Sequence, residues 1–224
     1  CCSVSSLCML VLDEADRMLD MGFEKSIRDI AWNCFGGERQ RAKQVFLYSA
    51  TWPPEVAEVA AAIMSENAVK VSVGSGDRKL TASKSVTQRV HVVADAAARW
   101  AAFVSLIEPF GPRGSHGGKR VIVFANMKST VKKVTTYCQG RGMAVECISG
   151  DRSQSQREST LRRFKDGSVS VVIATDVAAR GLDVKGIDRV INYELPGEDF
   201  HDYVHRIGRT GRAGATGEAD SLFG

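Results

Sequence analysis

Several features that mark whole classes of protein are missing from this sequence. No CxxC spacing occurs among the six cysteines, which stand at positions 1, 2, 8, 34, 138 and 147, so neither a zinc site nor a redox pair is indicated. No signal peptide, transit segment or apolar run long enough to cross a membrane is visible in these 224 residues. We therefore expect reduced cysteines in an intracellular protein that does not associate with membranes; nucleus and cytoplasm are not distinguished.

An initiator methionine is also missing, because the chain begins with Cys1 just before the pattern of a strand. We expect the chain to be a piece of something longer. Its composition is that of an ordinary globular protein, with 44% hydrophobic and 25% charged residues, which disfavours disorder. The formal net charge of +4 suits a nucleic-acid partner without requiring one.

Apolar runs alternate with helical patterns in residues 1–73, which predicts an α/β unit. Three strands are expected, the first two of them buried, at 7–12, 44–50 and 69–73. Two helices are expected, the second with prolines in its first turn, at 24–35 and 53–66. The first helix has an apolar face made by Ile27, Ile30, Ala31 and Cys34.

Residues 74–85 read GSGDRKLTASKS and have no apolar period, which is typical of a linker. The same α/β alternation then resumes over residues 86–224. Strands are expected at 86–93, 120–125, 144–148, 169–174 and 188–193. Helices are expected at 96–108, 128–141, 153–165 and 199–208. Ser153 and Gln156 form a capping-box pattern at the start of the third of these helices.

Polar clusters follow several of the predicted strands, and in open α/β sheets ligands bind beyond the carboxyl ends of the strands. The clusters are DEAD (13–16), SAT (49–51), TDVAARGLD (175–183) and HRIGRTGRAG (205–214). Three of them, DEAD, SAT and HRIGRTGRAG, also have a plainer interpretation. Acids favour helix N-termini, Ser and Thr cap helices, and arginines line solvated loops. Gly181 permits close approach of the backbone to a ligand, and arginine forks suit polyphosphate.

Together these clusters carry a resemblance to a known family. The strings VLDEADRMLDMGF, SATWP, GDRSQSQRE, ATDVAARGLDV and HRIGRTGRAG resemble the motifs of DEAD-box RNA helicases, in the family's order and near its usual spacing. The resemblance covers nearly the whole chain. It implies two RecA-like parallel-sheet domains, the first incomplete, which close over ATP and RNA.

The resemblance implies roles for individual residues around the nucleotide. Asp13 would place Mg²⁺ through water, and Glu14 would orient or activate the hydrolytic water. Asp16 would bridge to the coupling segment Ser49, Ala50 and Thr51. On the second domain the implied residues are His205 in the interdomain network, Arg209 and Arg212 at the γ-phosphate, and Gly181 and Asp183 at the nucleotide.

The resemblance also implies an RNA site, formed by Gly150, Asp151, Gln154, Arg157 and Thr175. Contacts to phosphates and 2′-hydroxyls would make binding largely independent of sequence. The implied cofactors are ATP and Mg²⁺. The implied partners are RNA and protein cofactors, with a monomeric chain.

The chain departs from the family pattern in three places. No G-x-x-x-x-G-K-[ST] phosphate loop occurs in it, so we expect this chain alone to have little ATPase activity. Met127 stands where the family often has a threonine, which removes one hydroxyl contact to RNA. Asp220 stands where an apolar strand is usual, so we expect the chain to diverge there.

Two other functions fit parts of the sequence. A module that binds RNA or a protein without catalysis would explain the missing phosphate loop, if the chain is naturally complete. A DNA translocase has similar motifs, but DEAD together with HRIGRTGR argues against it. His201 and His205 have i, i+4 spacing on a predicted helix, yet no third metal ligand stands near them in the sequence.

Overall fold

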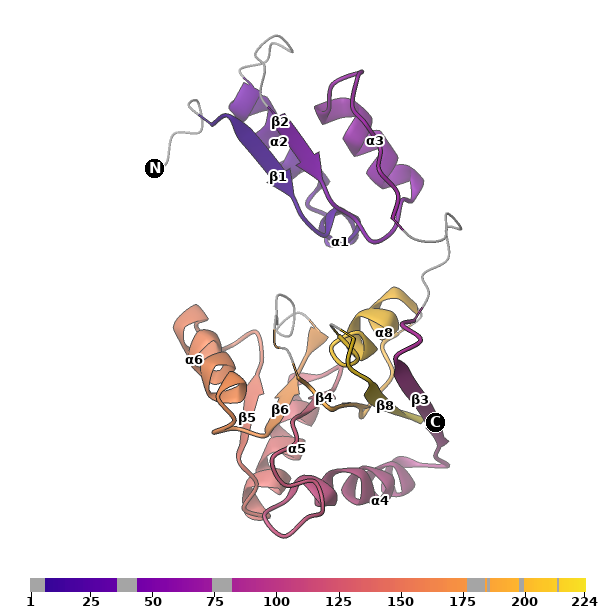
Figure 1. The fold of residues 1–224 in the computed structure, drawn as a ribbon, viewed down its shortest axis with the longest axis vertical. Helices are drawn as coiled ribbons and strands as arrows, with labels where there is room; N and C mark the ends of the chain where they lie inside the picture. The colour runs from indigo at the N-terminus through magenta and orange to yellow at the C-terminus, as the bar shows by residue number, and fades with distance from the viewer. Residues whose placement is uncertain are drawn as a thin grey trace. The chain divides into compact units, whose positions relative to one another are not determined.

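The computed structural model describes residues 7–35, 44–73, 82–176, 184, 186–197, 200–212 and 214–224. Contacts divide the chain into two compact units, Cys1–Leu80 and Thr81–Gly224. This division falls within the predicted linker 74–85, of which residues 74–81 lie outside the described part. Figure 1 shows the ribbon of both units.

The first unit is a small parallel α/β layer. Strand β1 (Met9–Leu12) pairs in parallel with β2 (Gln44–Leu47), so that Leu10 lies opposite Val45 and Leu12 opposite Leu47. Three helices accompany this sheet: α1 (Ala15–Asp20), α2 (Glu24–Phe35) and α3 (Pro54–Ile63). The sequence predicted α2 with the same bounds, whereas α1 was expected only as the plainer interpretation of the DEAD acids.

Only one face of the first unit's sheet is packed in the described residues. Leu12, Ile27 and Val59 form its core, together with partly buried Leu10 and Leu47. On the other face Met9 is 50% exposed and Val11 51% exposed. The prediction that both strands are buried was therefore wrong. Successive side chains of a strand point to opposite faces, and among the described residues the helices pack on one face.

The strand predicted at 69–73 is also absent from the described structure. Val69, Val71 and Val73 are all exposed there, and no strand is assigned to them. Their alternation fits a strand that buries one face, but such a strand needs a neighbour to pair with.

The second unit contains a six-stranded sheet in the described residues, and every pairing in it is parallel. The strand order is β3-β8-β7-β4-β6-β5. These strands are β3 (Val86–Val92), β4 (Val121–Phe124), β5 (Val145–Ile148), β6 (Val171–Ala174), β7 (Arg189–Asn192) and β8 (Gly217–Phe223). The helices are α4 (Ala96–Ile107), α5 (Lys128–Gly140), α6 (Gln154–Lys165) and α8 (Phe200–Ile207), with a 3₁₀ turn η1 (Glu108–Phe110) that the sequence did not predict.

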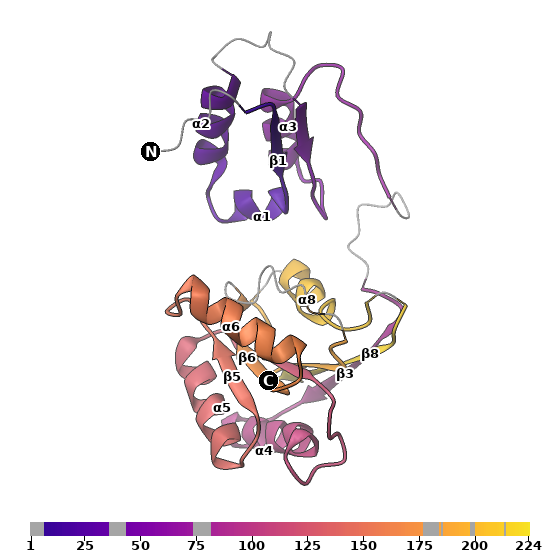
Figure 2. The same ribbon diagram turned by 60° about the vertical axis from the view of Figure 1, so that its left-hand side comes forward.

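Helices cover both faces of this larger sheet (Figure 2). On one face Phe164 of α6 and Ile207 of α8 pack on Ile122 and Val172. On the other face Phe103 of α4 and Val134 of α5 pack on Val123 and its neighbours. Strands buried on both faces read as continuous apolar runs, which is why VIVF and VVIA were recognisable in the sequence.

Two local predictions for the second unit had different outcomes. The capping box at α6 is confirmed, since the Ser153 hydroxyl accepts from Gln156 N and the Gln156 side chain accepts from Ser153 N. The expected divergence at Asp220 was wrong, because residues 217–223 form β8. Asp220 is buried, and its Oδ1 lies 2.8 Å from Nε2 of His91 on β3. Basic neighbours thus accommodate a carboxylate at an apolar position.

The four cysteines of the described residues, Cys8, Cys34, Cys138 and Cys147, are not linked to one another. Cys138 is buried among apolar side chains of α5, and this burial raises the pKa of its thiol to about 12. Such a thiol stays protonated and serves as a small apolar filler.

Candidate functional site

The predicted site segments follow the carboxyl ends of strands in both units. Residues 13–16 follow β1 and residues 49–51 come shortly after β2, whereas residues 150–151 come after β5 and Thr175 directly follows β6. Within each unit the paired strands are parallel. Their carboxyl ends therefore meet at one edge of each sheet, which is the usual ligand-binding edge.

In the first unit Asp16 joins the two polar segments. Its Oδ2 accepts hydrogen bonds from Thr51 N at 3.0 Å and from Thr51 Oγ1 at 2.6 Å. The backbone N of Asp16 donates to Ser49 Oγ at 3.1 Å. The structure thus brings three of the predicted residues into one hydrogen-bonded cluster, while Ala50 is exposed between them.

The carboxylate of Asp16 is held in its charged form. Its side chain is 7% exposed, and this burial by itself raises the pKa. The hydrogen bonds from Thr51, from Arg17 N and from Ser49 outweigh the burial, so the pKa of Asp16 lies below its ordinary value. Hydrogen bonds to a carboxylate favour the ionised state, so Asp16 is a fixed acceptor and not a proton donor.

Asp13 and Glu14 have different surroundings from Asp16. Glu14 is the N-cap of α1 and has φ 53°, in the left-handed region, where a residue other than glycine is strained. Asp13 is exposed, and its Oδ1 accepts from Glu14 N at 2.9 Å.

One exposed carboxylate at a strand end fits the way proteins hold Mg²⁺. No cluster of three or more His, Cys, Asp or Glu that suits a metal lies in the part of the chain that the structure describes. Mg²⁺ is commonly held by one or two carboxylates, its own waters and substrate phosphates. Asp13 therefore suits a Mg²⁺ ion that is bound mainly by nucleotide phosphates and water, and not one bound only by protein ligands.

In the second unit the predicted RNA residues lie along the ends of β5 and β6. Asp151 accepts a hydrogen bond from the Lys128 ammonium group, which also lies over Gly150. Thr175 N donates to Ile148 O at 3.4 Å, which ties the two strand ends together. Arg157 is half-buried in the first turn of α6. Gln154 begins that helix, but its side chain lies outside the described part.

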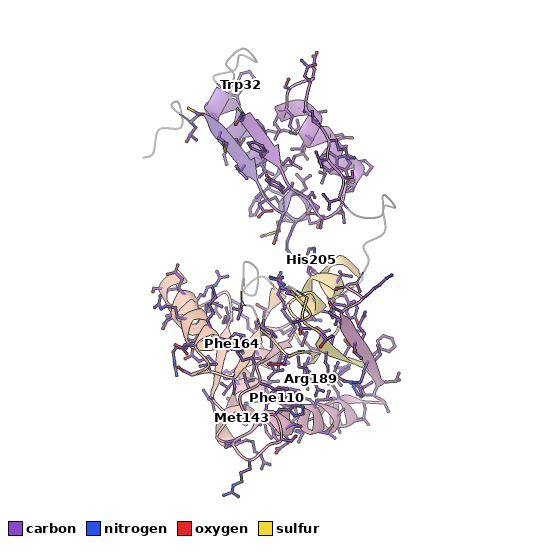
Figure 3. All side chains as sticks on the ribbon, viewed as in Figure 1. Trp32, Phe110, Met143, Phe164, Arg189 and His205 are labelled. Atoms are coloured by element: carbon purple, nitrogen blue, oxygen red, sulfur yellow. The ribbon has the colours of Figure 1, made fainter. Side chains whose placement is uncertain are left out.

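Helix α8 carries His205 (Figure 3), and the turn after this helix contains the predicted arginines. Arg209 Nε donates to His205 O at 3.2 Å, and Arg212 Nε donates to Gly208 O at 2.6 Å. Both side chains are half-buried, as is that of His205.

Arg206 differs from these two arginines, although all three recur at the same spacing in the sequence. Its side chain is 1% exposed. Its Nε and Nη2 donate to the two carboxylate oxygens of Asp176, at 2.6 and 2.5 Å. Arg206 is therefore distinct from Arg209 and Arg212, the two arginines that the resemblance places at the γ-phosphate. Its role was missed because spacing alone does not tell which side chain points inward.

Gly211 shows why glycine is needed in the turn after α8. It has φ +65°, and a Cβ there would lie 2.6 Å from Val86 Cγ2. The Ser85 hydroxyl donates to Gly211 O at 2.7 Å. The arginine-bearing turn is thus held against the start of β3. Gly181 and Asp183, predicted at the nucleotide, lie outside the described residues.

Comparison with known proteins agrees with this division. The family model described as "DEAD/DEAH box helicase" matches residues 2–59. The model described as "Helicase conserved C-terminal domain" matches residues 98–214, which is more than half of the chain. Each model covers a different unit of the structure.

The curated proteins that this chain resembles include RNA helicases of two yeasts. The chain is 45% identical over 214 residues to an "ATP-dependent RNA helicase DBP2" of Lodderomyces elongisporus, covering 96% of this chain and 36% of the relative. It is 44% identical over 215 residues to the protein of that name from Saccharomyces cerevisiae, covering 96% of this chain and 37% of the relative. The chain therefore spans little more than a third of the length of these relatives.

Solved structures also match this fold. S. cerevisiae Dbp5 L327V, bound to RNA and ADP BeF3, has a TM-score of 0.75 and 27% identity, and the match covers 96% of this chain and 52% of that one. A DEAD box protein from Methanococcus jannaschii has a TM-score of 0.55 and 34% identity, with coverage of 96% of this chain and 53% of that one.

Among the described residues, no helix is both long and apolar enough to cross a membrane.

Proposed function

Because this chain belongs to the DEAD-box RNA helicases, we propose that the protein carrying it couples hydrolysis of Mg-ATP to the opening of RNA duplexes or the remodelling of RNA–protein complexes. The chain spans about a third of its curated relatives, so the activity proposed is that of the whole protein.

The observation that carries this proposal is the bond pattern of Asp16. A buried carboxylate joins the DEAD segment to Ser49 and Thr51 across two strand ends. Movement of either segment is therefore transmitted to the other. A link of this kind is what coupling between a hydrolytic centre and a mechanical step requires.

The other acids have complementary roles in the proposal. Asp13 positions Mg²⁺ through water, and when bound the metal neutralises charge on the phosphates. Glu14 orients the attacking water or accepts its proton. Arg209 and Arg212, together with Gly181 and Asp183, act on the nucleotide from the second unit, where guanidinium groups stabilise developing negative charge. His205 takes part in the interdomain network that the resemblance implies.

RNA binding is assigned to the second unit. Gly150, Asp151 and Thr175 lie at neighbouring strand ends, and Gln154 and Arg157 lie on the first turn of α6. Backbone amides, hydroxyls and one guanidinium suit phosphates and 2′-hydroxyls, so affinity should depend little on base sequence.

The proposal extends to the surroundings of the protein. We place the protein inside the cell as a monomer that works with protein cofactors. One matched structure is of S. cerevisiae Dbp5 L327V bound to Gle1 H337R and IP6, which supports a role for such cofactors.

The test is RNA-stimulated hydrolysis of Mg-ATP by the natural product that contains this sequence, with any flanking residues it has. Glu14→Gln keeps the shape of the side chain and removes its charge, and it should lower kcat at least about a hundredfold. The matched control is Glu55→Gln on the exposed surface of α3, which should leave kcat unchanged. Wild-type activity equal to that of Glu14→Gln would contradict the proposed role.

A second candidate function is an RNA- or protein-binding module without catalysis. It is favoured by the six-stranded sheet of the second unit in the described residues, because the ends of β5 and β6 carry proposed RNA residues without any part of the first unit. RNA binding by the natural product without any ATP hydrolysis would select this function over the first.

A further inference from the structure

Arg206 donates hydrogen bonds through all three of its guanidinium nitrogens at the carboxyl edge of the second unit's sheet. Besides its two bonds to Asp176, Nη1 donates to Glu194 O and Nη2 donates to Asn126 Oδ1, both at 2.6 Å. The guanidinium carbon lies 5.3 Å from the centre of the Phe124 ring. Four donations to three acceptor residues leave this arginine no room to reach a phosphate without giving up buried partners.

These partners come from three different strand ends. Asn126 follows β4, Asp176 follows β6 and Glu194 follows β7, whereas Arg206 lies on α8. The same junction is reinforced without Arg206, because Asn126 N donates to Glu194 Oε2 at 2.8 Å and Asn126 Nδ2 donates to Leu195 O at 2.7 Å. Arg206 is therefore the point where α8 is joined to the carboxyl edge of the sheet.

Two proposed functional groups flank this junction. Asp176 directly follows Thr175, the hydroxyl residue at the proposed RNA site. Arg206 directly follows His205, whose carbonyl accepts from Arg209. A bidentate arginine–carboxylate pair has a fixed planar geometry. The Asp176–Arg206 pair thus sets the position of the β6 end relative to α8.

We propose that Arg206 is a positioning residue, which acts through Asp176 to hold Thr175 in place for the RNA backbone and to hold α8 in register with it. This inference rests on the proposed RNA-binding function. It assigns Arg206 no contact with RNA or nucleotide, in contrast to Arg209 and Arg212.

The experiment measures binding of a fluorescent single-stranded RNA to the 224-residue chain by anisotropy, over a series of salt concentrations. Arg206→Lys keeps the charge but loses the planar fork. Temperatures are kept well below the unfolding midpoint of every variant, so that changes in affinity do not reflect unfolding. Arg141→Lys is the matched control, because Arg141 precedes β5 and lies at the opposite edge of the sheet.

A positioning role predicts that Arg206→Lys weakens binding about tenfold, as for loss of one hydrogen bond to a charged group. Arg206→Gln removes the charge as well, and its slope of log K against log salt should equal that of the wild type, because no phosphate contact is lost. Asp176→Asn should weaken RNA binding by a similar factor. The double variant should bind RNA no more weakly than the single variant with the lower affinity, because both changes break the same pair. If Arg206→Lys lacks the native near-ultraviolet circular dichroism, Asn126→Ser removes one acceptor and should weaken binding about threefold.

Three results would overturn the inference. A salt slope shallower by about 0.7 in folded Arg206→Gln would make Arg206 a direct phosphate ligand. Unchanged RNA affinity in folded Arg206→Lys would show that Arg206 has only a structural role. If Arg206→Lys does not fold, unchanged RNA affinity in Asn126→Ser would show the same. If the wild-type chain does not bind RNA, the RNA-binding proposal for this unit fails and this inference with it; binding by wild type with unaffected variants refutes the inference alone.

Discussion

The two units of this chain place polar residues at strand ends in the same way but support them differently. In the first unit Asp16 is held by hydrogen bonds beside a sheet packed on one face. In the second unit the Asp176–Arg206 pair lies at the carboxyl edge of a sheet that is packed on both faces. The comparison teaches that site geometry in the first unit depends on a few hydrogen bonds, whereas in the second it is reinforced by a large core.

The largest effect should come from emptying the second unit's core. Phe103→Ala removes a fully buried ring that contacts Trp100 and Tyr193, and it should lower the free energy of unfolding by about 3–5 kcal/mol. Urea unfolding followed by tryptophan fluorescence, with Trp32 and Trp52 replaced by phenylalanine in both proteins so that only Trp100 reports, measures the change. Val92→Ala on the exposed side of β3 should change stability by less than about 0.5 kcal/mol. Similar losses in the free energy of unfolding for Phe103→Ala and Val92→Ala would contradict the assignment of Phe103 to the core.

The next effect concerns the hydrogen bonds of the first unit. Asp16→Asn keeps the shape of the side chain but removes its charge from the Thr51 and Ser49 cluster. It should lower the free energy of unfolding by about 1–3 kcal/mol. Chemical unfolding of the full chain is the measurement, with Asp29→Asn on the exposed side of α2 as the control. Equal stability of the two variants would mean that Asp16 does not hold the segments together.

A smaller effect should follow from closing the space around Gly211. Gly211→Ala places a Cβ 2.6 Å from Val86 Cγ2 in a residue with φ +65°, so it should destabilise the second unit by about 1–2 kcal/mol. Gly140→Ala at the end of α5 meets nothing within 4 Å and should be neutral or slightly stabilising. Thermal unfolding of both variants tests this difference. A neutral Gly211→Ala would show that the turn relaxes freely.

The smallest effect is a pH dependence in the second unit. Hydrogen bonds from Arg89 and Arg189 lower the pKa of Glu218 to about 2. The unfolded chain therefore binds this proton more readily than the folded chain, and the stabilisation is present above the ordinary glutamate pKa. It should fall away as the pH drops from about 4.5 toward 2. Unfolding midpoints in that window should fall less steeply for Glu218→Gln; parallel curves would contradict the ion pairs.

The sequence predicted local features well where local rules decide them. The bounds of α2, the capping box of α6 and the apolar strands β4 and β6 follow from periodicity and cap chemistry. The exposed faces of β1 and β2 did not follow, because burial depends on what covers a sheet and not on the strand itself. For the same reason residues 69–73 read as a strand although none is assigned there.

The site was predictable as a set of residues but not as a set of contacts. The family resemblance picked out Asp16 and Thr51, and the structure supplied the bonds between them. Asp220 looked misplaced because its partner His91 lies on a strand far away in the sequence. The burial of Arg206 likewise depends on Asp176 and Asn126, which no short-range pattern connects to α8.

The most direct test of the contrast between the units compares two activities of the purified 224-residue chain. We predict that it binds single-stranded RNA of unrelated sequences with similar, salt-sensitive affinity, through its fully packed second unit. We also predict little hydrolysis of Mg-ATP, because the chain has no G-x-x-x-x-G-K-[ST] loop to hold the phosphates. RNA-stimulated hydrolysis by this chain, or failure to bind RNA, would contradict the account.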